Sequence, residues 1–143
     1  MYVLRSEQRF RAPLDEVFEF FSRPENLERI TPSWLRFSIL TPSPVPMRDG
    51  QRIDYRLSLF GLPLHWQSEI SAHDPPHRFV DEQRRGPYRV WHHEHRFRAE
   101  GGETVVQDIV HYAAPLGPLA QIVVAPQLRR IFQGRRRALA EIF

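Results

Sequence analysis

The stretch YRVWHHEHRFRAEGGETVVQDIVHYA, residues 88–113, decides the fold because it predicts two β-strands joined by a tight turn. On both sides of Gly101 and Gly102, bulky apolar residues alternate with polar ones, which is typical of strands with one buried face. A Gly-Gly pair favours a two-residue turn, and a four-residue loop closed by Ala99 and Thr104 gives the same register. We therefore expect an antiparallel hairpin in which Ala99 pairs with Thr104.

This register assigns each residue of the hairpin to one face of the sheet. On one face the pairs are Phe97 with Val106, His95 with Asp108, His93 with Val110 and Trp91 with Tyr112. That face carries the aromatic residues and valines, so we expect it to be covered, with His93 and His95 pointing inward. His92, opposite His111, and Glu94, opposite Ile109, then point outward to solvent. A loop of three or five residues would break this pairing.

The rest of the chain supplies more strands, two short helices and one long helix. Alternation predicts strands over residues 2–11, 34–40, 53–59, 64–73 and 77–83, with Gly61 and Pro63 marking a hairpin. Apolar spacing predicts short helices over residues 14–21 and 24–30, and a long C-terminal helix beyond Pro126, with a weak point at Gly134. This order is typical of a single α+β domain over residues 1–143, in which a helix covers one face of an antiparallel sheet.

The composition is close to that of average globular proteins, with 41% hydrophobic and 26% charged residues. All 20 basic residues are arginines, spread along the chain without a nucleic-acid-binding motif, and the net charge is only +3, so we expect no nucleic-acid partner. The absence of cysteine excludes disulfides and thiolate chemistry. The first residues do not resemble a signal peptide, and we expect a cytoplasmic location.

The covered face of the sheet is more polar than a plain structural core. The same alternation places Tyr55, Trp66, Ser68, Asp81 and Gln83 on it, together with Leu57, Leu64, Ile70 and Phe79. Two carboxylates, two histidines, a glutamine, a tyrosine and two tryptophans would all point inward. Because buried polar groups of this number are unusual in a core, we expect a partly polar cavity between the sheet and the helix.

The inward histidines allow three interpretations. His93 and His95 lie on one face of one strand and, with Asp81 or Asp108, would supply three metal ligands, but no metal-binding motif is present and we predict no metal. Alternatively, Asp108 orients His95 as a general base. The simplest interpretation, which we favour because no nucleophile or oxyanion hole is evident, is that the His95–Asp108 pair satisfies two buried polar groups.

The arginines of the C-terminal helix, residues 129–130 and 135–137, are interpreted as a solvated helix face. The alternative combines them with the apolar segment from Leu116 to Val124 as a membrane-facing entrance for a lipid-like ligand. Trp34 and Met47, which lie beside loops, would line the same entrance.

Four segments together resemble the START-like, helix-grip (SRPBCC) superfamily, and in particular its small polyketide cyclase/dehydrase-like members. They are APLDEVFEFFSRPENLERITP, DPPHRFVDEQRRGPYRVWHHEHRF, TVVQDIVHYAAPLGPL and IFQGRRRAL, and the resemblance covers essentially the whole chain. It implies a curved seven-stranded antiparallel sheet around the long C-terminal helix, two short helices after the first strand, and a deep cavity. It implies no catalytic motif, because the superfamily has none in common.

The resemblance and the polar face together lead to a functional hypothesis. We expect a hydrophobic or amphipathic small molecule, lipid-, polyketide- or aromatic-like, in a cavity of at least about 300 Å³. The expected lining is Tyr55, Trp66, Asp81, Trp91, His93, His95, Asp108, Tyr112, Leu128 and Ile131. We expect no cofactor, and either a monomer or a homodimer. The alternatives are a cyclase, dehydrase or isomerase with His95 and Asp108 as base, and a ligand-free protein-interaction domain with a dimer interface at residues 116–124.

Overall fold

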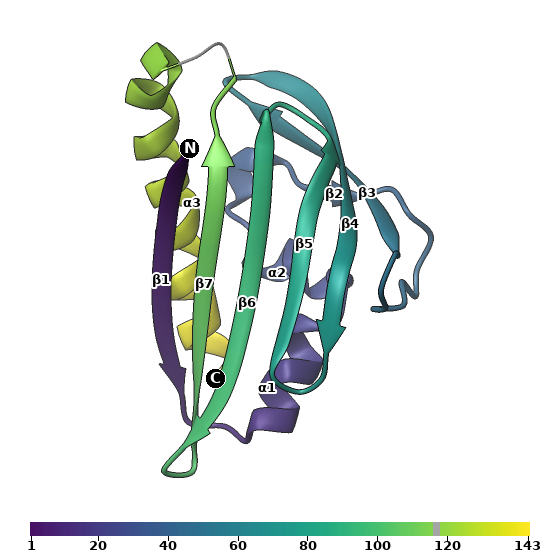
Figure 1. Cartoon of the computed structure of the whole chain (residues 1–143), viewed down its shortest axis with the longest axis vertical. Coiled ribbons are helices and arrows are strands. Elements are labelled where there is room, and N and C mark those ends of the chain that lie inside the picture. Colours follow the sequence, from purple (N-terminus) through teal and green to yellow (C-terminus); the bar gives the residue numbers. More distant parts are fainter. Residues whose placement is uncertain (116–117) are drawn as a thin grey trace.

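A computed structural model describes residues 1–115 and 118–143 as one curled antiparallel sheet with helices on one side (Figure 1). The strands are β1 (Tyr2–Phe10), β2 (Ser38–Ile39), β3 (Arg52–Leu59), β4 (Leu62–Asp74), β5 (Arg78–Arg85), β6 (Val90–Glu100) and β7 (Glu103–Ala113). The helices are α1 (Leu14–Phe21), α2 (Leu27–Ile30) and α3 (Gln121–Ile142), with short 3₁₀ turns η1 (Pro24–Asn26), η2 (Ser33–Leu35) and η3 (Pro118–Ala120).

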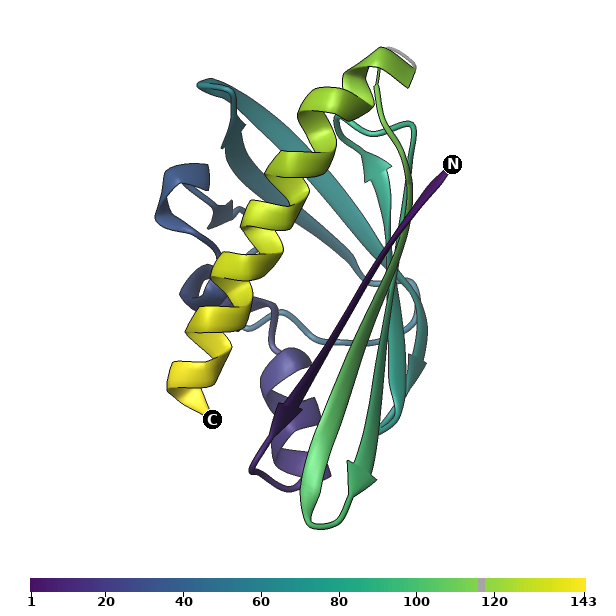
Figure 2. The same cartoon turned by 90° about the vertical axis from the view of Figure 1, so that its left-hand side faces the viewer.

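The seven strands lie in the order β1-β7-β6-β5-β4-β3-β2, and each neighbouring pair is antiparallel. Helix α3 runs diagonally across the face toward which the sheet curls, and α1 and α2 lie on that same side (Figure 2). This is the α+β helix-grip architecture expected from the sequence. The expected two short helices after the first strand and the long C-terminal helix are both present.

The β6–β7 hairpin has the register predicted from its glycine turn. Ala99 pairs with Thr104, His95 with Asp108 and Trp91 with Tyr112. Both glycines of the turn have positive φ angles, 57° and 82°, which residues with a Cβ adopt only with strain. The turn chemistry therefore fixes which residues of these two strands share a face.

Two predicted elements differ from the structure. The strand expected from Trp34 to Leu40 is mostly absent: Ser33–Leu35 form a 3₁₀ turn, Arg36 has a left-handed backbone, and only Ser38 and Ile39 pair with β3. Helix α3 begins before Pro126 and runs through it. Pro126 and Ile122 both lie on the exposed side of α3, where the carbonyl that loses its partner can bond to water.

The outer face of β6 is less open than expected. Glu94 points to the outer face, as the register requires, but it is only 9% exposed because Arg78 and Arg96 both bind its carboxylate. His92 also lies on this face, beside His111, and is half-buried. The expectation that Glu94 faces solvent is therefore wrong, because Arg78 on β5 and Arg96 on β6 cover its carboxylate.

The buried residues form separate clusters around the space between α3 and the sheet. One cluster packs α1 against the turn end of β6 and β7 and includes Phe18, Phe21 and Phe97. Another packs the N-terminal half of α3 against the opposite end of these strands and includes Tyr112 and Leu128. His93 and His95 lie along β6 between the two clusters, where neither cluster fills the space.

Candidate functional site

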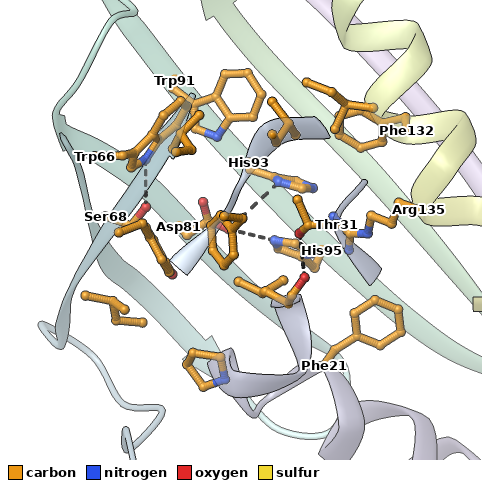
Figure 3. Close-up of a pocket in the computed structure, with 18 of the residues that line it drawn as sticks. Phe21, Thr31, Trp66, Ser68, Asp81, Trp91, His93, His95, Phe132 and Arg135 are labelled. Atoms are coloured by element: carbon orange, nitrogen blue, oxygen red, sulfur yellow. Dashed lines mark hydrogen bonds and ion pairs between the residues drawn. The ribbon is translucent and has the colours of Figure 1, made fainter. Parts of the chain in front are cut away.

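A cavity lies between the sheet and α3, at the middle of β6 (Figure 3). Its apolar lining comes from strands β3 to β6, from helices α1, α2 and α3, and from the segments around them: Phe21, Pro24, Leu27, Leu35, Phe37, Met47, Ile53, Tyr55, Leu57, Leu59, Trp66, Ile70, Phe79, Tyr88, Trp91, Leu128, Ile131 and Phe132. Its polar lining is small and consists of Thr31, Ser68, Asp81, His93, His95 and Arg135. An apolar space with a few convergent polar groups is the usual form of a small-molecule site.

The volume of this cavity is about 190 Å³. That is below the roughly 300 Å³ expected from the sequence as the lower end for ligand pockets, and this part of the expectation is wrong. A cavity of about 150 Å³ lined by Leu, Ile and Phe is enough to bind benzene. As it stands, the cavity therefore accommodates a single ring or a short chain.

The histidines, Asp81 and Arg135 form one cluster with Asp108 at one side of the cavity. His95 Nε2 lies 2.7 Å from Asp81 Oδ2, and His93 Nε2 lies 2.8 Å from Asp108 Oδ1. His95 Nδ1 is 3.4 Å from the same Asp108 oxygen, and Arg135 Nη2 is 3.6 Å from it. Strands β5, β6 and β7 and helix α3 thus each contribute to one buried network.

The two imidazole rings are held by stacking as well as by hydrogen bonds. Their centroids are 3.7 Å apart, and Phe79 stacks on the other side of His95 at 4.0 Å. His93 and His95 are two residues apart on β6, so both rings project from the same face of the strand. The resulting column of Phe79, His95 and His93 fixes the direction in which each ring nitrogen points.

Burial and the neighbouring charges shift the four titratable groups in different directions. Burial raises the pKa of Asp81 and Asp108, but the cations and hydrogen bonds around them outweigh it, and the pKa of Asp108 lies well below its ordinary value. Burial and the charge of His95 lower the pKa of His93. Burial also lowers the pKa of His95, but the carboxylates of Asp108 and Asp81 beside its two ring nitrogens outweigh it and raise the pKa. The folded pair therefore favours a charged His95 beside a neutral His93.

The structure contains the expected strand pairing of His95 with Asp108, but not the expected hydrogen bond between them. Asp108 lies opposite His95 in the ladder, but its shortest hydrogen bond is with His93, and His95 bonds to Asp81 on the other neighbouring strand. The reason is that an inward side chain on β6 has neighbours on both β5 and β7, and the ring rotamer decides between them.

Three of these groups lie close enough together to be considered as metal ligands. One ligand atom from each of Asp81, His93 and His95 falls within 4.8 Å of the others. However, the planes of the stacked imidazoles are only 24° from parallel. A metal bound in the plane of one ring would lie far out of the plane of the other, so this arrangement does not suit a metal without rotation of a ring.

Most of the residues expected to line the cavity do so. Tyr55, Trp66, Asp81, Trp91, His93, His95, Leu128 and Ile131 all line it. Asp108 lies behind the two histidines, and Tyr112 packs with Tyr88 and Leu128 in the neighbouring cluster, so neither lines the cavity. Gln83 does not line it either, because its side chain bonds to the backbone of Tyr88.

Arg135 is the residue that sequence reasoning misplaced. The run of arginines predicts a solvated helix face, yet the side chain of Arg135 is only 12% exposed and lines the cavity. Arg129, Arg130, Arg136 and Arg137 are exposed, as expected. Helical spacing contained the signal, since Arg135 is seven residues after Leu128 and four before Leu139, on the buried stripe.

Only part of the segment 116–124 is described by the structure. Leu116 and Gly117 lie outside the described residues, while Leu119, Ile122 and Val123, near the start of α3, are exposed. A surface hollow of about 550 Å³ lies between Val123 and Trp34, and Arg130 lies over the Trp34 ring at 5.0 Å. Met47 lies in the main cavity. None of the described helices has the length and apolar character needed to span a membrane.

The fold and the cavity together define a helix-grip domain of the ligand-binding kind. The family model for polyketide cyclase/dehydrase and lipid transport proteins matches residues 10–140, and the chain belongs to this family. No curated protein has a sequence that matches the chain significantly.

Solved structures of the same fold cover nearly the whole chain. Protein CV1439 from Chromobacterium violaceum has a TM-score of 0.77 at 15% identity, covering 99% of this chain and 97% of its own. Protein Ms6760 from Mycobacterium smegmatis has a TM-score of 0.74 at 20% identity, covering 98% and 89%. The major latex-like protein 151 from Panax ginseng has a TM-score of 0.72 at 14% identity, covering 96% and 94%. At these identities the similarity shows the fold alone.

Proposed function

We propose that the protein binds a hydrophobic or amphipathic small molecule, of about the size of a single ring, in the cavity between the sheet and α3. The observation that carries this proposal is a mostly apolar cavity with all of its charged groups gathered at one side. Such a site desolvates the body of a ligand and orients its polar end. Among lipid-, polyketide- and aromatic-like ligands, the volume of about 190 Å³ favours the single-ring aromatic ones.

The proposed contacts follow from the positions of the side chains. Tyr55, Trp66, Trp91, Leu128 and Ile131 would surround the apolar body of the ligand. Asp81, His93 and His95 would face its polar end, and Asp108 would hold the two histidines in place without touching the ligand. Aromatic walls of this kind favour a flat ring, because edge and face contacts are both available.

The other two functions considered from the sequence have less support. Both ring nitrogens of His95 face carboxylates, Asp81 at 2.7 Å and Asp108 at 3.4 Å, so a substrate would have to compete with a carboxylate for either nitrogen. A ligand-free interaction domain was expected to have a filled cavity, whereas the space here is open.

The test uses a cavity-filling variant and a neutral probe. Ser68 lines the cavity and is 3% exposed, so Ser68→Phe should occupy the space that a ligand would take. We expect benzyl alcohol to shift amide resonances of β4, β6 and α3 in the wild type, and this effect to be lost in Ser68→Phe. The control, Ser38→Phe, changes an exposed residue and should bind as the wild type does.

Two outcomes would contradict the proposal. One is an absence of saturable shifts in the wild type with benzyl alcohol and with other single-ring probes. The other is unchanged binding in Ser68→Phe, which would place the ligand elsewhere. Native mass spectrometry of the purified protein would add the mass of any molecule that co-purifies.

A further inference from the structure

Arg135 is a buried cation whose hydrogen-bonding capacity is mostly unused. Its side chain is 12% exposed, and its Nε and Nη2 atoms are buried without a hydrogen-bond partner among the described residues. Burying a charged group whose N–H donors are unpaired is costly, and proteins keep such groups mainly where a partner arrives. Arg135 also lines the cavity, so its side chain borders the space that a ligand would fill, and a ligand would pair with Nε and Nη2 once the contacts that now cover these atoms move aside.

The nearest anion does not satisfy this arginine. Asp108 Oδ1 is 3.6 Å from Arg135 Nη2, beyond hydrogen-bond distance. The same oxygen accepts a hydrogen bond from His93 at 2.8 Å and lies 3.4 Å from His95 Nδ1. Asp108 therefore neutralises part of the charge on the guanidinium but leaves its donors open.

The guanidinium group is held in place by two aromatic rings. Its central carbon lies 5.4 Å from the centre of the Phe21 ring and 5.8 Å from that of Phe132. Both rings line the cavity and belong to different helices (Figure 3). Such contacts fix the group before a ligand binds, which lowers the entropy cost of binding.

The two unpaired nitrogens identify the chemical group that fits. The Nε–H and one Nη2–H bond of a guanidinium point in parallel along one edge, and a carboxylate accepts both at once through its two oxygens. A single carbonyl oxygen satisfies only one of them well. A doubly charged phosphate would add more negative charge beside Asp81 and Asp108 than a carboxylate does.

We propose that the ligand is a carboxylic acid with a single-ring or similarly small apolar body, whose carboxylate pairs with the Nε–Nη2 edge of Arg135. The inference rests on the proposed function and narrows it to one ligand class. The ring would lie among the tryptophans and leucines on the far side of the cavity. The paired donors would then no longer be buried without a partner.

The experiment compares two probes of the same shape and different charge. Phenylacetate carries the carboxylate, and phenylacetamide replaces it with a neutral amide. We expect calorimetry to show that the wild type binds phenylacetate about 10- to 100-fold more tightly, because hydrogen bonds to charged groups contribute that much. Arg135→Met should bind both probes about equally.

Two further variants complete the test. Arg129→Met removes an exposed arginine of the same helix and should keep the preference of the wild type. Arg135→Lys retains the charge but not the paired donors, and should show a preference between those of the wild type and Arg135→Met. This variant also keeps the test valid if Arg135→Met fails to fold.

The outcomes separate this inference from the proposed function. If the wild type shows no preference for phenylacetate over phenylacetamide while both bind, or if Arg135→Lys keeps the full preference of the wild type, the carboxylate inference is overturned and cavity binding stands. A preference that survives in a folded Arg135→Met also overturns it. If neither probe binds and benzyl alcohol does not bind either, the proposed single-ring function fails as well.

Discussion

At the scale of single residues, the cavity depends on five charged or titratable side chains that nearly balance one another. Asp81 and Asp108, whose pKa values are lowered, carry negative charge, Arg135 carries positive charge, and the raised pKa of His95 favours its charged form. Burial and the charge of His95 lower the pKa of His93, which favours its neutral form. Buried ion pairs do not by themselves stabilise a fold, so this network is more simply explained by what it positions than by stability.

The histidine pair predicts a pH dependence of stability. In the unfolded chain both rings titrate near about pH 6.5, so the chain holds two protons well below that pH and none well above it. The folded pair keeps one, because the pKa of His95 is raised and that of His93 is lowered. The free energy of unfolding therefore rises with pH below about 6.5, where the unfolded chain binds more protons, and falls above it, where the folded chain does.

The measurement is urea unfolding of the wild type from pH 5 to 8.5, a range in which Asp81 and Asp108 stay ionised because their pKa values are lowered. The free energy of unfolding should peak near about pH 6.5. A free energy that changes in one direction only across this range would contradict the assignment of one proton to the pair. Nitrogen chemical shifts of the two rings in the wild type give each pKa directly.

Sequence reasoning predicted the faces of these residues but not their partners. The glycine turn and the alternation of β6 were sufficient to place His93 and His95 inward and Asp108 opposite His95. The choice between Asp81 and Asp108 as hydrogen-bond partners depends on ring rotamers, which alternation does not encode. Arg135 was missed because charge was taken as evidence of exposure, although its helical spacing matched the buried stripe.

At the scale of elements, helix α3 is positioned by a close contact rather than by its composition. Gly134 was expected to be a weak point, since glycine disfavours helix. In the structure a Cβ at position 134 would lie 2.8 Å from Pro32 Cγ, in the segment that follows α2. The glycine therefore lets the chain after α2 approach α3, which keeps the helix over the cavity.

The contact with Pro32 predicts that replacing Gly134 with alanine destabilises the protein. Gly134→Ala gains about 1 kcal/mol of helix propensity, but overpacking against a rigid proline ring typically costs about 1–3 kcal/mol. We expect Gly134→Ala to lower the thermal midpoint. The control Gln133→Ala, at an exposed position of the same helix, should change the free energy of unfolding by less than about 0.5 kcal/mol. A higher midpoint for Gly134→Ala would show that Pro32 moves away without cost.

Long, strongly patterned elements were predictable, whereas short and interrupted ones were not. Strands β3, β4, β6 and β7 have the alternation of half-buried strands, and their positions agree closely with the predicted ones. The segment around Arg36 has the residues of a strand, but a left-handed turn, which leaves no trace in the hydrophobic pattern, interrupts it. Pro126 predicts a helix that starts beyond it, because proline occurs at helix starts more often than inside helices, whereas α3 starts at Gln121.

At the scale of the whole molecule, the size of the cavity is set by the distance that the curled sheet keeps from α3. Aromatic clusters at both ends of the space hold the helix and the sheet together. Packed cores resist expansion, so the cavity does not enlarge without breaking contacts in those clusters. Sequence reasoning predicted the existence of this space but overestimated its volume, because the volume depends on how all the lining side chains pack together.

If the distance between the sheet and α3 is fixed, the protein should select ligands by size. Phenylacetate fits a cavity of about 190 Å³, whereas the second ring of 1-naphthylacetate must displace lining side chains. Because such overpacking typically costs about 1–3 kcal/mol, the wild type should bind 1-naphthylacetate roughly 10- to 100-fold more weakly. Ile131→Ala removes a lining side chain and should narrow this difference, while Ile122→Ala, at a position that is 73% exposed on the same helix, should not. Equal binding of the two acids by the wild type would mean that α3 moves away from the sheet easily, and the lipid- and polyketide-sized ligands of the family would then fit as well.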